Sequence, residues 1–148
     1  MKLLKICGYL LLSILLLSMK SDNDRKNLLC HTWIQFASKQ NITSAPQMTD
    51  KSMAKKIIFK ADGTYEDAIY NDQFKTSGNW YLNEDETKME FTISSINGKD
   101  VPPFSEKSRH FNIIILKLNA DTLIYGNEVY KGKDMIYDHF DSYFVRKD

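Results

Sequence analysis

The sequence predicts an all-β domain: an antiparallel up-and-down barrel of about eight strands with one short helix, preceded by an N-terminal signal helix. Three observations lead to this prediction. Apolar residues recur with a period near two, turn residues interrupt the pattern at short intervals, and most links between strands are too short for crossovers. Closing such a meander into a barrel leaves no exposed edge strand. A sandwich is the second choice, because only two loops, 38–54 and 98–108, are long enough for crossovers.

The first twenty residues have the composition of an export signal. Lys2 and Lys5 precede an uncharged run of 14 residues from Ile6 to Met19, which is shorter than the roughly 20 residues that a membrane-spanning helix needs. We therefore expect an exported protein, located in the periplasm, on the outer-membrane surface or outside the cell. The membrane is expected as a partner only through this segment.

The end of this segment leaves its processing open. Leu16-Leu17-Ser18 is typical of the residues that precede the lipid-bearing cysteine of bacterial lipoproteins, but Met19 occupies the next position. A thioether cannot accept the lipid that a thiol accepts. The segment is either an ordinary signal peptide, cleaved or retained, or a degenerate lipoprotein signal.

The remaining chain divides into a linker over residues 21–28 and one barrel domain over residues 29–148. Without residues 1–20, 17 basic side chains face 19 acidic ones, a formal charge of −2. No concentrated basic surface is left for the phosphates of a nucleic acid, so nucleic acid is not an expected partner. A domain of this length suits a single core, and we expect a monomer.

The strands are predicted in chain order at residues 31–37, 56–60, 64–70, 74–82, 89–93, 110–118, 122–125 and 137–146. Trp33 and Phe36 mark the first strand. Asp62-Gly63 predicts a tight hairpin, because both residues tolerate a positive φ. Trp80 lies in the fourth strand, which ends at a charged tip, 83–86.

The second half of the chain continues the pattern. Met89, Phe91 and Ile93 alternate with polar residues, as in a half-buried strand. A long apolar strand turns at residues 119–121, and the last strand is rich in Tyr, Phe and Val, which favour strands.

One short helix is predicted at residues 47–55. Thr49 or Asp50 would cap it, and Met48 and Met53 would supply its apolar contacts. Pro102-Pro103 opens an irregular loop that cannot occupy the centre of a sheet.

Residues that would perform chemistry are few. Cys30 is the single cysteine after residue 20 and is interpreted as a small buried hydrophobic residue, although pairing with another chain stays open. His31, His110 and His139 are too far apart in sequence to indicate a metal site, so none is predicted. No nucleophile motif or phosphate-binding glycine loop is present. We therefore expect no enzyme and no cofactor.

Four stretches together resemble bacterial lipocalin-like domains, which are small secreted or lipoprotein β-barrels. They are LCHTW at 29–33, IFKADGTY at 58–65, GNWYL at 78–82 and LNADTL at 118–123. The order and spacing of the four stretches match across nearly the whole domain. The resemblance implies a barrel whose mouth is able to take a small apolar molecule, in a group most of whose members have no defined ligand.

Two functions follow for such a barrel. The first is binding of a small hydrophobic ligand, with Trp33, Trp80, Phe91 and Phe104 as the candidate ligand-binding residues. In this function Phe104 belongs to an apolar loop tip, 101–104, that controls access. The alternative is a cell-envelope interaction or structural protein with a filled core and no small ligand, in which the two tryptophans only fill the core.

Overall fold

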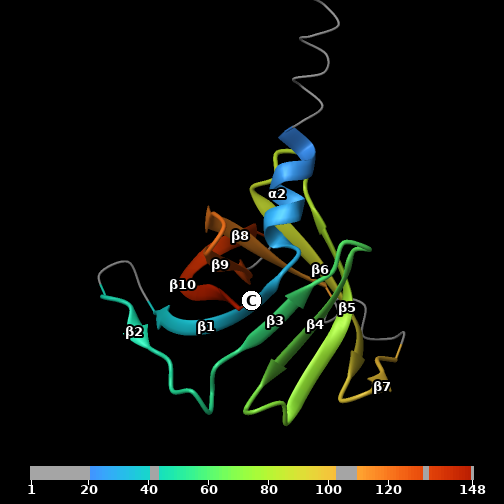
Figure 1. Cartoon of the computed structure of the whole chain (residues 1–148), viewed down its shortest axis with the longest axis vertical. Coiled ribbons are helices and arrows are strands. Elements are labelled where there is room, and N and C mark those ends of the chain that lie inside the picture. Colours follow the sequence, from blue (N-terminus) through green and yellow to red (C-terminus); the bar gives the residue numbers. More distant parts are fainter. Residues whose placement is uncertain (1–20, 41–43, 103–109, 132–133, 148) are drawn as a thin grey trace, which may run out of the picture.

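The computed structural model describes residues 21–40, 44–102, 110–131 and 134–147, and its strands form one closed antiparallel barrel (Figure 1). The elements are α2 (Ser21–Leu29), β1 (Thr32–Lys39), β2 (Gln47–Met48), β3 (Lys56–Phe59), β4 (Thr64–Ile69), β5 (Phe74–Leu82), β6 (Lys88–Ile96), β7 (Lys99–Asp100), β8 (His110–Leu118), β9 (Thr122–Lys131) and β10 (Asp134–Lys147). The predicted signal segment and Phe104 lie outside the described residues.

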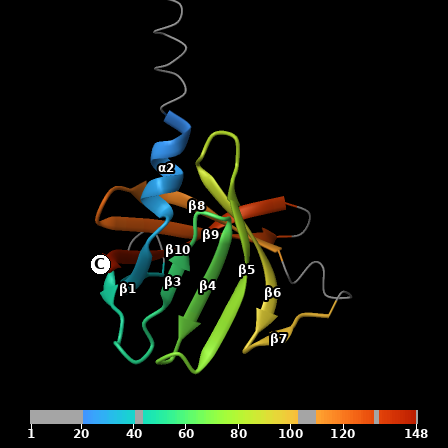
Figure 2. The ribbon, with the colours of Figure 1, turned by 45° about the vertical axis from the view of Figure 1, so that its right-hand side comes forward.

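The barrel is an up-and-down meander. Its ten strands pair in the order β10-β9-β8-β6-β5-β4-β3-β1-β2, with β7 beside β6. β2 and β7 have two residues each, so the other eight strands form the wall, and β1 closes it by pairing along β10 from Thr32↔Lys147 to Lys39↔Asp141. This confirms the predicted fold class and excludes the sandwich, which would keep two separate sheets. Figure 2 shows β8, β9 and β10 crossing behind β3 to β6.

Two hairpin turns share one arrangement of side chains. The carboxylate of Asp62 accepts hydrogen bonds from the backbone N and the hydroxyl of Thr64, at 2.9 and 2.7 Å, and Gly63 has φ +85°. Asp85 accepts the same two bonds from Thr87, at 3.1 and 2.6 Å. An aspartate two residues before a threonine satisfies backbone groups that the turn would leave unpaired, which explains why both predicted turns form.

The short helix lies elsewhere than predicted. Residues 47–55 form a two-residue strand and turns, and Met48 and Met53 are 79% and 54% exposed. An amphipathic helix needs a core beneath its apolar side, and here neither methionine has one. Asp50, the expected cap, instead accepts the backbone N–H of Ser52 at 2.8 Å. The helix is α2, which occupies the segment predicted as a linker.

The last two strands are longer than predicted and contain an irregularity. Their pairing is continuous from Val145↔Thr122 to Asp141↔Gly126, then shifts before resuming at Tyr137↔Glu128. His139 has φ +59° inside this bulge. The Tyr137 ring covers the backbone of Gly126, where an added Cβ would lie 2.3 Å from the ring. The glycine therefore permits the bulged strand to fold over β9.

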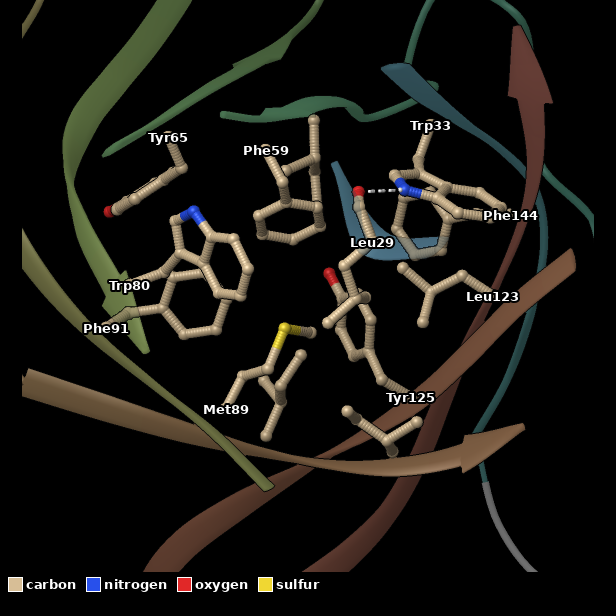
Figure 3. Close-up of a cluster of buried hydrophobic side chains, with 13 residues drawn as sticks. Leu29, Trp33, Phe59, Tyr65, Trp80, Met89, Phe91, Leu123, Tyr125 and Phe144 are labelled. Carbon is tan, nitrogen blue, oxygen red and sulfur yellow. Dashed lines mark hydrogen bonds between the residues drawn. The ribbon is translucent and has the colours of Figure 1, made fainter. Parts of the chain in front are cut away.

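The core consists of large side chains that point into the barrel (Figure 3). Trp33 and Phe144 are fully buried, Trp80 is 3% exposed, and Phe59 packs edge-on against Trp80 with ring centroids 5.3 Å apart. The other members are Leu29, Ile57, Tyr65, Met89, Phe91, Ile113, Ile115, Leu123 and Tyr125. Both indole N–H groups are satisfied by backbone carbonyls, Trp33 by Leu29 at 2.9 Å and Trp80 by Thr64 at 3.0 Å.

The two ends of the barrel differ. α2 covers one end, where Leu29 is fully buried in the core. We call this the closed end, and the opposite end, formed by β2, the β4–β5 turn and β7, the mouth end (Figure 1). Among the described residues, no helix combines the length and apolar character needed to cross a membrane.

Candidate functional site

Toward the mouth end, the inner surface of β4, β5 and β6 becomes accessible. Side chains alternate along β5, so Thr76 and Phe74 share the inner face with Trp80. Their cross-strand partners Ile96 and Ile69 lie on the same face. Phe74 is 40% and Ile96 is 37% exposed. We call the four partly exposed apolar side chains of this face, Ile69, Phe74, Ile93 and Ile96, the inner mouth wall.

An ion pair lies inside the barrel beside this wall. The ammonium of Lys55 is 2.7 Å from Oδ2 of Asp67, and the two side chains are 26% and 14% exposed. Asp67 is on the inner face of β4, two residues from Tyr65. Lys55 precedes β3, and its carbonyl accepts the backbone N–H of Gln35 at 2.8 Å. The backbone therefore fixes the lysine where its side chain turns inward.

Further polar groups surround the ion pair. Tyr125, on β9, is 4% exposed, and its hydroxyl interacts with Lys55 and Ser142. Gln35 donates from Nε2 to Oγ of Ser142 at 3.4 Å. We call Lys55, Asp67, Tyr65, Tyr125, Ser142 and Gln35 the mouth polar cluster.

The surroundings shift the pKa of two members of this cluster. Burial alone would lower the pKa of Lys55. The interactions of its ammonium with Tyr125 and Asp67 outweigh the effect of burial, so the pKa is raised. The lysine is therefore charged in the folded protein. Burial raises the pKa of Tyr125, so its hydroxyl stays neutral.

Tyr65 carries an enclosed hydroxyl with no hydrogen-bond partner at bonding geometry among the described residues, although the Thr76 side chain lies near it. The residue is 1% exposed, and burial raises its pKa to about 12. Figure 3 shows the hydroxyl turned away from Phe59. Its charged neighbours are Asp67 and Lys55. An unpaired buried hydroxyl costs about 1–3 kcal/mol, so this group could gain a bond from a ligand.

The structure brings three of the four predicted site residues together. Trp33, Trp80 and Phe91 belong to the packed core, at 0%, 3% and 3% exposure. Phe91 also stacks on Phe111, with ring centroids 4.6 Å apart. Both tryptophans are therefore buried, with Trp33 at 0% and Trp80 at 3% exposure. The position of Phe104 is not described.

The sequence interpretation missed the mouth polar cluster. Lys55 falls at the end of the expected helix, and its pairing depends on where β3 begins. Tyr65 and Asp67, however, are two residues apart in a predicted strand, so alternation alone would have placed the carboxylate on the inner face. An acidic residue in phase with a core aromatic is the signal that could have found the site.

Shallow depressions also lie on the outside of the barrel. One, of about 270 Å³, covers the outer face of β3, β4 and β5, where Ile58 and Ala68 are flanked by Lys56 and Lys75. A second, of about 360 Å³, lies between Lys26 of α2 and residues 80–86. Trp80 is the core residue that the second depression reaches.

Within the described part of the chain, no three His, Cys, Asp or Glu residues are grouped to hold a metal ion. Asp141 accepts a hydrogen bond from the hydroxyl of Tyr137.

Cys30 is half-buried against the core, and burial raises the pKa of its thiol. A raised pKa leaves less of the nucleophilic thiolate at neutral pH.

The comparisons with known proteins support the fold. No known protein family and no curated protein matches the sequence. A lipocalin-like protein from Bacteroides uniformis matches with a TM-score of 0.53 at 13% identity, covering 81% of this chain and 99% of that chain. A DUF4847-family protein from Bacteroides vulgatus has a TM-score of 0.46 at 14% identity, with 82% and 96% covered. The first likeness shows that the chain has a lipocalin-like barrel fold, as the sequence resemblance implied.

Proposed function

We propose that the protein is a non-catalytic binding module that holds a small, largely apolar molecule at the mouth end of its barrel. The observation that carries the proposal is the change in the inner surface from sealed core to the partly exposed inner mouth wall, beside the mouth polar cluster. Ligand sites typically combine mainly apolar lining with a few placed polar groups. Trp33, Trp80 and Phe91 then form the floor beneath the ligand.

The test is saturable binding of a neutral apolar dye, N-phenylnaphthylamine, to the purified domain. We expect one-to-one binding, and we expect Phe74→Ser to weaken it about tenfold or more, since burying an aromatic side chain against a ligand contributes about 1.5–3 kcal/mol. Tyr81→Ser is the matched control, because Tyr81 is 54% exposed on the outer face of the same strand. The control should bind the dye as the unmodified protein does.

The second candidate function is that of an interaction protein with a filled barrel. The packed core at the closed end and the depression over Ile58 and Ala68 on the outer face favour it. Absence of saturable binding across fatty acids, sterols and aromatic dyes would support this candidate and contradict the first.

A further inference from the structure

We propose, as an extension of the binding function above, that the polar end of the ligand is uncharged and carries both a hydrogen-bond donor and an acceptor, as in an alcohol or a primary amide on an apolar body. Two independent features of the mouth polar cluster lead to this ligand class. They are the closed ion pair of Lys55 and Asp67 and the buried hydroxyl of Tyr65, which has no hydrogen bond of good geometry to any residue that the structure describes.

The ion pair selects against charged ligands. Its 2.7 Å separation balances one positive and one negative charge inside the barrel. A ligand carboxylate that approached Lys55 would also approach Asp67, and a ligand ammonium would meet the reverse problem. Breaking a largely buried pair, or desolvating a third charge beside it, is strongly unfavourable. A neutral polar group leaves the pair intact.

Tyr65 is the reason to expect a hydrogen-bonding group on the ligand. A phenol hydroxyl both donates and accepts, so a ligand hydroxyl or amide can pair with it in either direction. Tyr65 also lies next to the charged pair, which polarises a neutral ligand group placed among the three side chains. The inner mouth wall, with Phe74 and Ile96 more than one-third exposed, would contact the apolar body of the same ligand.

The experiment is displacement of bound N-phenylnaphthylamine at neutral pH by four ligands with the same chain: decanol, decanamide, decanoate and decylamine. We expect the alcohol and the amide to displace the dye at concentrations at least about tenfold lower than the acid and the amine, a difference of about 1.4 kcal/mol. Equal or tighter binding of decanoate or decylamine would overturn the inference while leaving the binding function standing. If the dye itself does not bind, the binding function fails first.

Two variants locate the preference on the protein. Tyr65→Phe should remove most of the advantage of decanol over decanoate, and dye binding should stay within about twofold because the ring is retained. Tyr81→Phe is the control, since its hydroxyl bonds to Glu90 on the exposed outer face. An unchanged ligand order in Tyr65→Phe would show that Tyr65 does not recognise the polar end.

Discussion

At the scale of single residues, Tyr65 combines a structural and a chemical feature. Its ring packs edge-on against Phe91, with centroids 5.1 Å apart and planes at 90°, so the ring belongs to the core. Its hydroxyl reaches the mouth polar cluster, where burial favours the neutral form. One side chain thus joins the sealed floor to the accessible mouth end.

The pH dependence of stability should reveal this hydroxyl. The folded-state pKa of Tyr65 is raised to about 12, whereas an unfolded tyrosine titrates near about 10. The contribution of Tyr65 to the free energy of unfolding is therefore fully present below about pH 10. It is lost as the pH rises toward 12, because over that range the unfolded chain gives up the tyrosine proton more readily than the folded protein does. Tyr65→Phe should make the alkaline fall in the free energy of unfolding shallower, measured by urea denaturation from neutral to alkaline pH.

At neutral pH the same variant should be as stable as the unmodified protein or more stable by up to about 1 kcal/mol, because it removes a buried hydroxyl that forms no well-aligned hydrogen bond with the described residues. Tyr70→Phe, which removes a hydroxyl from a 46% exposed residue, is the control and should leave the alkaline profile unchanged. A destabilisation of Tyr65→Phe above about 1 kcal/mol at neutral pH would mean that the hydroxyl has a partner in the folded protein.

At the scale of elements, the bulge between β5 and β6 shapes the inner mouth wall. The pairing shifts between Ser77↔Ser95 and Gly78↔Ile93, which inserts one extra residue into β6. Because side chains alternate along a strand, this insertion keeps both Ile93 and Ile96 on the inner face. The two backbones also approach each other closely beside the bulge.

Gly78 makes that approach possible. A Cβ at this position would lie 1.8 Å from the carbonyl oxygen of Thr92. We expect Gly78→Ala to destabilise the domain by more than about 2 kcal/mol, since backbone atoms must shift to admit the methyl group. Urea denaturation would measure the loss.

Gly98→Ala provides the comparison for this prediction. Gly98 has φ +74°, but the space that an added methyl group would occupy is open, so the cost there comes from backbone conformation alone, about 1 kcal/mol. If Gly78→Ala lowered the free energy of unfolding no more than Gly98→Ala does, the conclusion that β5 and β6 approach each other closely at Gly78 would be wrong.

At the scale of the whole molecule, α2 and the mouth lie at opposite ends of the barrel (Figure 1). The chain enters the barrel at the closed end, where Lys26 lies 5.9 Å from the centre of the Trp80 ring. A domain held to a membrane by the residues before α2 would therefore direct its mouth away from the point of attachment. The mouth end would then face the surrounding medium, and a ligand would exchange with that medium directly.

We propose that the protein is exported, and the sequence before α2 provides a test. Met19→Cys should convert the leader into a lipoprotein signal, because Leu16-Leu17-Ser18 already supplies the preceding residues. Metabolic labelling with palmitate should be positive for the variant and negative for the unmodified protein. Met19→Ser is the matched control and should stay unlabelled. Labelled unmodified protein would contradict the interpretation of Met19.

Sequence by itself determined the strand order, the turns and the core of this protein. Alternating apolar residues and aspartate-containing turns act over a few residues, so they can be interpreted locally, and the predicted strands 74–82 and 110–118 coincide with β5 and β8. Trp33 and Trp80, which were placed in two of the predicted strands, are both buried.

Tertiary structure decided the helix and the candidate site. Helix formation depends on what packs beneath it: α2 contacts the core through Leu29, whereas Met48 and Met53, the apolar residues of the expected helix, face no core. The mouth polar cluster joins Lys55, Asp67 and Tyr125, which come from three separate parts of the chain. Their meeting depends on barrel closure and strand register, which are long-range properties that no local pattern contains.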